Sequence, residues 1–86
     1  MKLTFSSKAW DEYLYWQKTD KAVLKRINSL IKDVMRDPFD GIGKPESLKH
    51  SLSGYWSRRI TDEHRLVYKV SDENLLIAQL RYHYEY

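Results

Sequence analysis

Residues 55–80 read YWSRRITDEHRLVYKVSDENLLIAQL, and this stretch decides the fold. It contains two runs and the beginning of a third that are rich in β-branched and aromatic residues, which favour extended strands. The runs are separated by DEH (62–64) and SDEN (71–74), which are short enough for hairpin turns. We therefore predict three consecutive antiparallel strands: YWSRRIT (55–61), RLVYKV (65–70) and LLIAQLRYHY (75–84).

Upstream of these strands the sequence predicts one short strand and two helices. KLTF (2–5) alternates as a strand does, and Ser6 or Ser7 can cap the helix that follows. Thr19 or Asp20 can cap a second helix, which Pro38 ends. The apolar stripe of that helix is Val23, Leu24, Ile27, Leu30, Ile31 and Val34. Residues 38–54 hold both prolines and all three glycines, so we expect a long connection there.

The order βααβββ indicates an α+β fold: an antiparallel sheet with two helices packed on one face. The 86 residues suit a single domain spanning 1–86, and 42% hydrophobic with 31% charged residues is typical of a globular chain. No cysteine is present, which excludes disulfides and thiolate chemistry. No run approaches the roughly 18 to 20 apolar residues of a membrane span. We expect a soluble, cytoplasmic protein without a membrane partner.

The segment from Lys44 to Lys69 carries an excess of positive charge, with six basic residues against the three acidic residues Glu46, Asp62 and Glu63. The formal net charge is +3 and the pI is about 9.2. The basic residues between positions 44 and 69 are Lys44, Lys49, Arg58, Arg59, Arg65 and Lys69. This distribution indicates a face that meets a polyanion. A merely solvated basic surface is the alternative that composition leaves open.

Most cofactor-based chemistry has no support in the sequence. There is no His-x-x-His, His-Glu-x-x-His or Asp-rich loop, so we expect no metal centre. GIGKPE (41–46) lacks the preceding strand and the terminal Lys-Ser or Lys-Thr of a nucleotide loop. SLSG (51–54) does not match a nucleophile elbow. We therefore expect no cofactor.

The remaining polar residues suit cleavage of RNA through its own 2'-hydroxyl. That reaction needs a base, a cation that holds charge on phosphorus and an acid for the departing 5'-oxygen. Glu46, Arg65 and His83 can fill these roles in that order, and the terminal tyrosines 82, 84 and 86 can stack unpaired bases. Each residue also has an ordinary reading, as a solvated loop carboxylate, an edge-strand charge or a half-exposed strand histidine. His64 lies in a turn, where we expect no chemical role, and we interpret the three tryptophans as packing residues.

Longer blocks carry a resemblance to a known family. They are RDPFDGIGKPESLKHSLSGYWSRRITDEHRLVYKV (36–70), RYHY (81–84) and WDEYLYWQKTDK (10–21). Together they closely resemble the YoeB/Txe family of the RelE toxin superfamily, over essentially the whole chain. The resemblance implies the toxin of a type II toxin–antitoxin pair: an mRNA endonuclease that cuts the codon in the ribosomal A site and so inhibits translation. It also implies the compact fold of small microbial ribonucleases.

The resemblance also implies roles for individual residues. By position, the general base falls on Glu46, the phosphate-stabilising arginine on Arg65, the general acid on His83 and a supporting tyrosine on Tyr84. Lys49 and Arg59 match basic positions that hold RNA or the ribosome, and we predict the same role for Lys44, His50, Arg58 and Arg81. This chain continues past the matching tyrosine with Glu85 and Tyr86, which adds a negative side chain near the acid histidine.

The implied partners are mRNA, the ribosome and a cognate antitoxin of the YefM/Axe type. We expect a disordered, acidic and hydrophobic segment of that antitoxin to fold over the basic face. A homodimer is a further expectation. One alternative is a module that occupies ribosomal RNA or the ribosome without chemistry, and another is an interaction subunit with no role in RNA binding.

Overall fold

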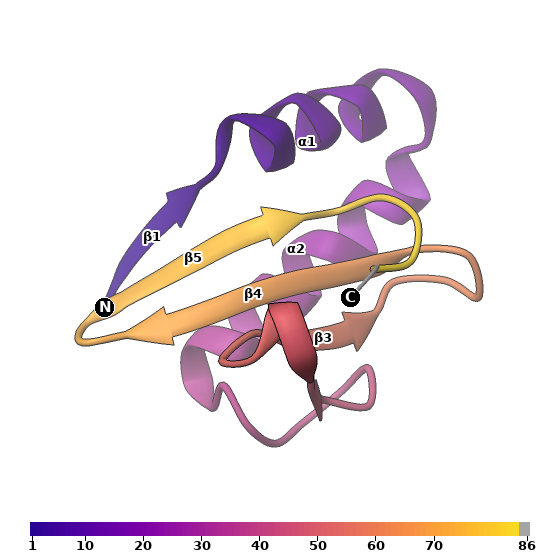
Figure 1. The fold of residues 1–86 in the computed structure, drawn as a ribbon. Coiled ribbons are helices and arrows are strands. Elements are labelled where there is room, and N and C mark those ends of the chain that lie inside the picture. Colours follow the sequence, from indigo (N-terminus) through magenta and orange to yellow (C-terminus); the bar gives the residue numbers. More distant parts are fainter. Residues whose placement is uncertain (85–86) are drawn as a thin grey trace.

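The computed structural model describes residues 1–84, and Figure 1 shows how its elements are arranged. In chain order they are β1 (Lys2–Phe5), α1 (Ser7–Thr19), α2 (Lys21–Arg36), β2 (Glu46–Ser47), the 3₁₀ helix η1 (His50–Leu52), β3 (Trp56–Arg59), β4 (Arg65–Ser71) and β5 (Asn74–Gln79). The predicted order is confirmed, with β2 as a short addition inside the expected long connection. The last strand ends at Gln79, five residues before its predicted end. The expectations for Glu85 and Tyr86 lie outside the described residues.

The strands form one mixed sheet in the order β1-β5-β4-β3-β2. Neighbouring strands are antiparallel except β1 and β5, which run parallel with Lys2 opposite Asn74. We predicted an antiparallel sheet, so this parallel edge is the difference. A hairpin turn fixes an antiparallel partner, whereas β1 leads directly into a helix and reaches β5 only through tertiary packing.

Both helices begin and end where the sequence indicates. Ser6 caps α1 and Asp20 caps α2, each by accepting backbone N–H bonds with its side-chain oxygen. α2 ends at Arg36, just before the residue that precedes Pro38. Within residues 1–84, neither helix is long and apolar enough to cross a membrane.

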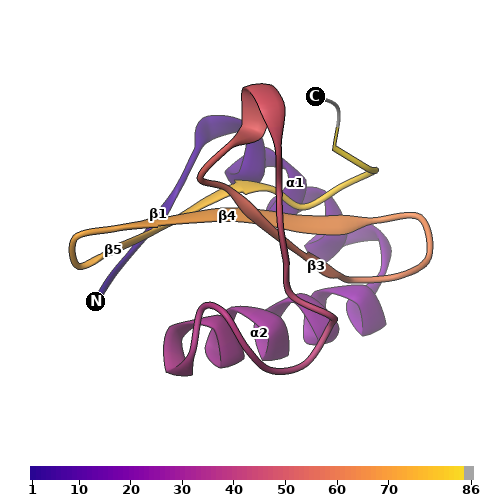
Figure 2. The same cartoon turned by 60° about the horizontal axis from the view of Figure 1, so that its bottom comes forward.

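The core lies between the sheet and the helices. α2 lies across one face of the sheet, while α1 runs alongside β1 and β5 (Figures 1 and 2). The buried residues of the core are Ala9, Trp16, Ile27, Leu30, Ile31, Val34, Ile60, Leu66, Tyr68, Leu75, Ile77 and Leu80. Figure 2 shows that η1 and the C-terminal segment lie on the other side of the sheet from α2. We call that side the open face.

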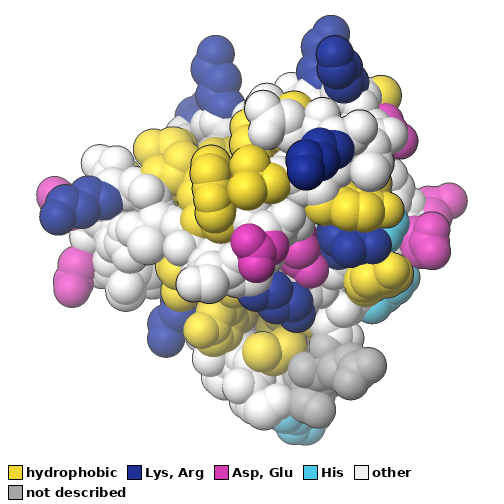
Figure 3. Space-filling view, turned by 90° about the horizontal axis from the view of Figure 1, so that it is seen from above, with side chains coloured by type: hydrophobic (Ala, Val, Ile, Leu, Met, Phe, Trp, Pro, Cys, Tyr) yellow, Lys and Arg dark blue, Asp and Glu magenta, His cyan; other side chains and the backbone are white. Residues whose placement is uncertain are grey.

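The tryptophans differ in how far they are buried. Trp16 is buried in the core, whereas Trp10 is 48% exposed and stacks on Tyr13 with 5.8 Å between ring centroids. Trp56 lies 4.9 Å from the ring of Phe39. Figure 3 shows the α1 side of the molecule, where exposed hydrophobic side chains gather among lysines and arginines. The interpretation as packing residues therefore holds for Trp16 and for Trp56, which packs against the core, whereas Trp10 stays half-exposed while its ring contacts Phe5 and Tyr13.

Candidate active site on the open face of the sheet

The strand register places Glu46 on the open face. Residues that pair across antiparallel strands point to the same side of a sheet. Glu46 pairs with Ser57, Ser57 with Val67, and Val67 with Gln79, so these four side chains form one row across β2, β3, β4 and β5. The next residue on β4, Tyr68, points into the core on the α2 side. The row therefore lies on the side away from α2.

Arg65 lies on the same face. It is two residues from Val67 on β4 and pairs with Arg59 on β3, so both arginines share the side of Glu46. Standard sheet spacings put about 12 Å between the Cα atoms of Glu46 and Arg65, two strands and two residues apart. Arg65 Nη1 donates to the carbonyl oxygen of Thr61 at 2.7 Å and to two further carbonyls of the β3–β4 turn. These bonds fix the guanidinium beside the open face.

The third predicted residue, His83, reaches this face through a turn. Gln79 Nε2 lies 2.7, 3.2 and 2.9 Å from the carbonyl oxygens of Arg81, Tyr82 and His83. Tyr82 has a left-handed backbone with φ of 62°, which bends the chain sharply. The predicted strand geometry for residues 80–84 is therefore wrong: the regular pairing ends at Gln79, and beyond it side chains and a backbone bond, from the Arg65 N–H to the Tyr82 carbonyl at 3.0 Å, bind this backbone.

His64 is a positioning residue that the sequence reasoning missed. Its Nδ1 accepts the backbone N–H of Tyr82 at 2.7 Å. Two α1 side chains hold Leu80, two residues earlier: Glu12 accepts the Leu80 N–H at 2.8 Å, and Trp16 Nε1 donates to the Leu80 carbonyl at 2.9 Å. These partners are 18 to 68 residues apart in sequence, so no local pattern points to them.

We expect Gln79→Leu to loosen the turn that carries His83 without unfolding the chain. Leucine keeps the bulk of glutamine but cannot donate to the three carbonyl oxygens. Backbone order parameters from ¹⁵N relaxation should fall at residues 81–83 from about 0.85 toward 0.6 or lower, while those of α2 stay unchanged. Gln17→Leu, on the exposed side of α1, is the matched control. Unchanged order parameters at 81–83 would show that Gln79 does not hold the turn.

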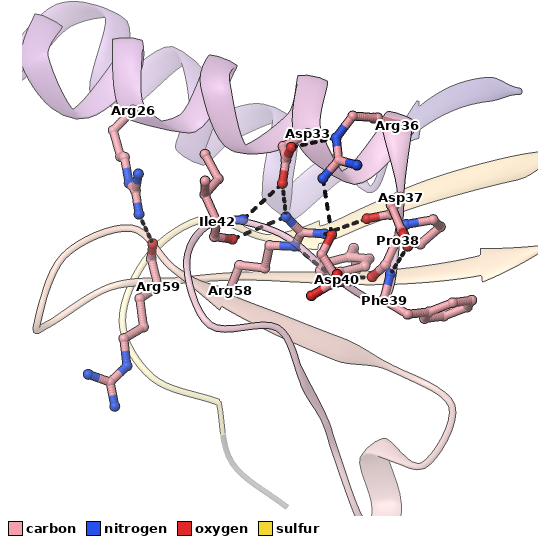
Figure 4. Close-up of polar contacts among 11 residues, drawn as sticks. Arg26, Asp33, Arg36, Asp37, Pro38, Phe39, Asp40, Ile42, Arg58 and Arg59 are labelled. Atoms are coloured by element: carbon pink, nitrogen blue, oxygen red, sulfur yellow. Dashed lines mark hydrogen bonds and ion pairs between the residues drawn. The ribbon is translucent and has the colours of Figure 1, made fainter.

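Arg58 does not belong to the RNA-binding set, and that prediction is wrong. Its side chain is fully buried on the α2 side of the sheet. Figure 4 shows the guanidinium surrounded by oxygen atoms of α2 and the loop that follows it. It donates to Asp33 Oδ2 at 2.5 Å, to the carbonyls of Asp37, Asp40 and Ile42 at 2.6 to 3.3 Å, and to the Tyr68 hydroxyl at 3.2 Å. A guanidinium used in this way cannot contact an external phosphate.

The Arg58 cluster instead sets the course of the loop that leads to Glu46. Tyr68, whose pKa is raised by burial, donates its hydroxyl to the Pro38 carbonyl at 2.5 Å. Farther along, Gly43 has φ of 81°, and a Cβ there would meet a methyl carbon of Leu30 at 2.7 Å. Only glycine fits this close approach of the loop to the core. The loop is therefore fixed at both points before the chain enters β2.

Asp33 makes the stability of this cluster depend on pH. The hydrogen bond from Arg36, together with those from the Ile42 N–H and Arg58, lowers the pKa of Asp33 from 3.8 to about 2. A lowered folded-state pKa gives stability that is complete above the unfolded value and is lost as pH falls toward the folded value. We expect the urea midpoint to decline between about pH 4 and pH 2. Asp33→Asn should lack this component, whereas exposed Asp11→Asn should keep it; equal slopes in all three proteins would contradict the assignment.

The other predicted binding residues lie at the surface. Lys44, Lys49, His50 and Arg59 are exposed, and Lys44 and His50 both have a left-handed φ of 54°. Arg81 is half-buried, with its guanidinium carbon 3.7 Å from the centre of the Tyr15 ring. Arg81 therefore also packs the C-terminal segment against α1. The roles of these residues in RNA binding stay predictions.

The open face also holds a cleft beside His83. It has a volume of about 530 Å³ and is lined by residues of α1, η1, β4, β5 and the C-terminal segment. Among the described residues, no group of three His, Asp or Glu side chains is placed to hold a metal ion. The half-buried Tyr84 ends the described segment. The fold and this face define a class: a small α+β protein whose basic, polar sheet face suits a phosphate-bearing ligand.

Comparisons with known proteins identify the family within that class. A family model described as YoeB-like toxin of bacterial type II toxin–antitoxin system matches residues 5–84. Toxin YoeB of Escherichia coli strain K12 is 68% identical over 84 residues, which cover 98% of this chain and all of that protein. The chain therefore belongs to the family of YoeB-like toxins, and both the resemblance and the predicted α+β fold are confirmed.

Solved structures of relatives have the same fold. The YoeB dimer from Staphylococcus aureus aligns with a TM-score of 0.91 and 50% identity, covering 98% of each chain. A YoeB–YefM complex from the same organism aligns with a TM-score of 0.90 and 49% identity, again over 98% of each chain. The predicted partners of the antitoxin and homodimer kinds thus occur among relatives of this chain.

Proposed function

We propose that this toxin is a ribosome-dependent mRNA endoribonuclease that cleaves the message in the ribosomal A site by acid–base attack of the 2'-hydroxyl. The observation that carries the proposal is the placement of Glu46, Arg65 and His83 on the open face. These residues come from β2, β4 and the C-terminal segment, so only the folded chain brings them together.

Each residue has one step in the proposed reaction. The Glu46 carboxylate takes the proton of the 2'-hydroxyl, and the oxygen attacks the adjacent phosphorus. Arg65 stabilises the negative charge that develops on the non-bridging oxygens. The His83 imidazolium gives its proton to the departing 5'-oxygen, so the products are a 2',3'-cyclic phosphate and a 5'-hydroxyl. Tyr84 supports the acid, and no step needs a cofactor.

Exposed basic residues around this face would hold the substrate. Lys44, Lys49, His50 and Arg59 lie at the surface near the ends of β2 and β3, where they can contact the message or ribosomal RNA. The half-buried Arg81 belongs to the same predicted set. Neutralising phosphates in this way makes ribosome binding weaken steeply as salt rises.

The proposed regulators are a YefM-like antitoxin and, in its absence, self-association. The complex and the dimer solved for the S. aureus relative support both. The antitoxin segment would be acidic and hydrophobic, because the surface it covers combines basic residues with exposed aromatic rings such as Trp10 and Tyr82.

The chemical ends of the message test the proposal. Purified toxin is added to ribosomes that carry a defined mRNA, and the new ends are analysed. Cleavage in the A-site codon with a 2',3'-cyclic or 3'-phosphate upstream end is the expected result. An intact message on a toxin-bound ribosome would replace the proposal with a binding module that acts without chemistry.

A further inference from the structure

The cleft beside His83 is lined by residues that, apart from His83, have no part in the proposed reaction steps. Its lining includes Lys8 at the start of α1, Ser51 of η1, Tyr55 before β3, and His83, and its floor includes Val67. A volume of about 530 Å³ lies within the range of small-ligand sites. An aromatic ring, an apolar floor, hydroxyl groups and one cation together match the base, sugar and phosphate of a nucleotide.

The position of the cleft on the sheet distinguishes the two sides of the cut. Tyr55 is two residues before Ser57 on the chain, and Lys69, two residues after Val67, lies 5.4 Å from the Tyr55 ring centre. The cleft therefore extends from the central row toward Lys69, whereas Arg65 lies on the opposite side of that row. In the proposed reaction the scissile phosphate is held by Arg65, and His83, the proposed acid, lines the cleft.

The acid and the base belong to different nucleotides of the substrate. A base acts on the 2'-hydroxyl of the upstream nucleotide, and an acid acts on the 5'-oxygen of the downstream one. In the described part of the chain the cleft is lined by His83 and not by Glu46. A group in the cleft is thus next to the leaving oxygen.

We propose that this cleft binds the ribonucleoside on the leaving-group side of the cut, with Tyr55 against its base and Lys8 at its 3'-phosphate. This inference rests on the proposed function, because it assigns His83 to the departing oxygen. Binding there places the 5'-oxygen beside the imidazole before the proton is transferred.

Adenosine 3'-monophosphate is the probe, because it has the free 5'-hydroxyl and 3'-phosphate of the downstream product. Titration into the ¹⁵N,¹³C-labelled toxin should shift the signals of Tyr55, Lys8 and His83 in a saturable way. Tyr55→Leu should weaken binding by about 5- to 100-fold, the range for loss of one stacking aromatic residue, while Tyr55→Phe stays close to the unaltered protein. Lys8→Met should weaken binding, and Lys18→Met, on the last turn of α1, should not.

A second measurement uses the message itself. An abasic nucleotide placed just downstream of the cut should slow cleavage by the unaltered toxin but cause little further loss in Tyr55→Leu. If the probe shifts Arg59 and Glu46 instead of Tyr55 and His83, or if Tyr55→Leu binds it normally, the inference is overturned while cleavage stands. If the probe binds as expected but no message is cut, the site stands and the proposed function fails.

Discussion

Glu46→Gln and His83→Gln are each expected to slow mRNA cleavage by about 10²- to 10⁴-fold, the usual contribution of a positioned general base or acid. Both changes preserve side-chain size and hydrogen bonding but remove the group that accepts or donates the proton. Single-turnover cleavage on programmed ribosomes measures the loss, and expression in growing bacteria reports the same loss as relief of translation arrest.

A matched control separates chemistry from surface charge. Glu73→Gln removes one carboxylate charge, as Glu46→Gln does, but at the exposed β4–β5 turn. This variant should cleave the message at the unaltered rate. Glu46→Gln and Glu73→Gln should bind ribosomes with similar affinity, since neither change removes a cation that pairs with phosphate. Normal cleavage by Glu46→Gln or His83→Gln would remove the assigned role.

Arg58→Met should destabilise the fold by about 3 to 5 kcal/mol, as expected when one partner of a buried ion pair is removed. Methionine fills much of the volume, but it leaves the Asp33 carboxylate and the carbonyls of Asp37, Asp40 and Ile42 without their shared donor. The melting temperature should fall by at least about 12 °C in a chain of this size. Calorimetry or urea unfolding measures the change.

The neighbouring arginine provides the comparison for this variant. Arg59→Met changes the same residue type one position along β3, where the side chain is exposed, and should shift stability by less than about 0.5 kcal/mol. Equal melting temperatures for the two variants would contradict the structural role of Arg58. A double change, Arg58→Met with Asp33→Asn, should cost less than the sum of the two single changes, because Arg58 and Asp33 share one ion pair.

The sequence predicted the regular elements well because their signals are local. The apolar stripe of α2 and the caps at Ser6 and Asp20 each depend on residues within one or two helical turns. β2 is only two residues long and is defined by the pairing of Glu46 with Ser57. It is too short to have a periodic pattern that would predict it. The parallel pairing of β1 likewise depends on contacts with residues about 70 positions away.

The burial of Arg58 has a signal in the sequence, the alternation of side chains along its strand, but the charge of the residue points the other way. Strand alternation puts Trp56, Arg58 and Ile60 on one side, and two of these are apolar, which favours the core face for the third. A buried arginine is rare without partners, however, and this favours an exposed position when residue type alone is considered. Its partners come from α2 and the loop after it, and only tertiary structure reveals them.

The candidate site was predictable by residue type but not by geometry. The need for a base, a cation and an acid selected Glu46, Arg65 and His83, and the resemblance supplied the same residues. What the sequence did not contain is the mechanism that presents His83: three carbonyls held by Gln79 and one N–H held by His64. These bonds join residues by tertiary contact, and they replace the strand that local propensity favoured.

The open face is proposed to catalyse attack of the 2'-hydroxyl on the adjacent phosphorus. The most direct test is the cleavage rate of two ribosome-bound messages that differ only by a 2'-deoxy nucleotide immediately upstream of the cut. We expect the all-ribose message to be cleaved and the substituted one to remain intact at that position. Cleavage of the 2'-deoxy message at a comparable rate would contradict the account, because water or another group would then have to be the nucleophile.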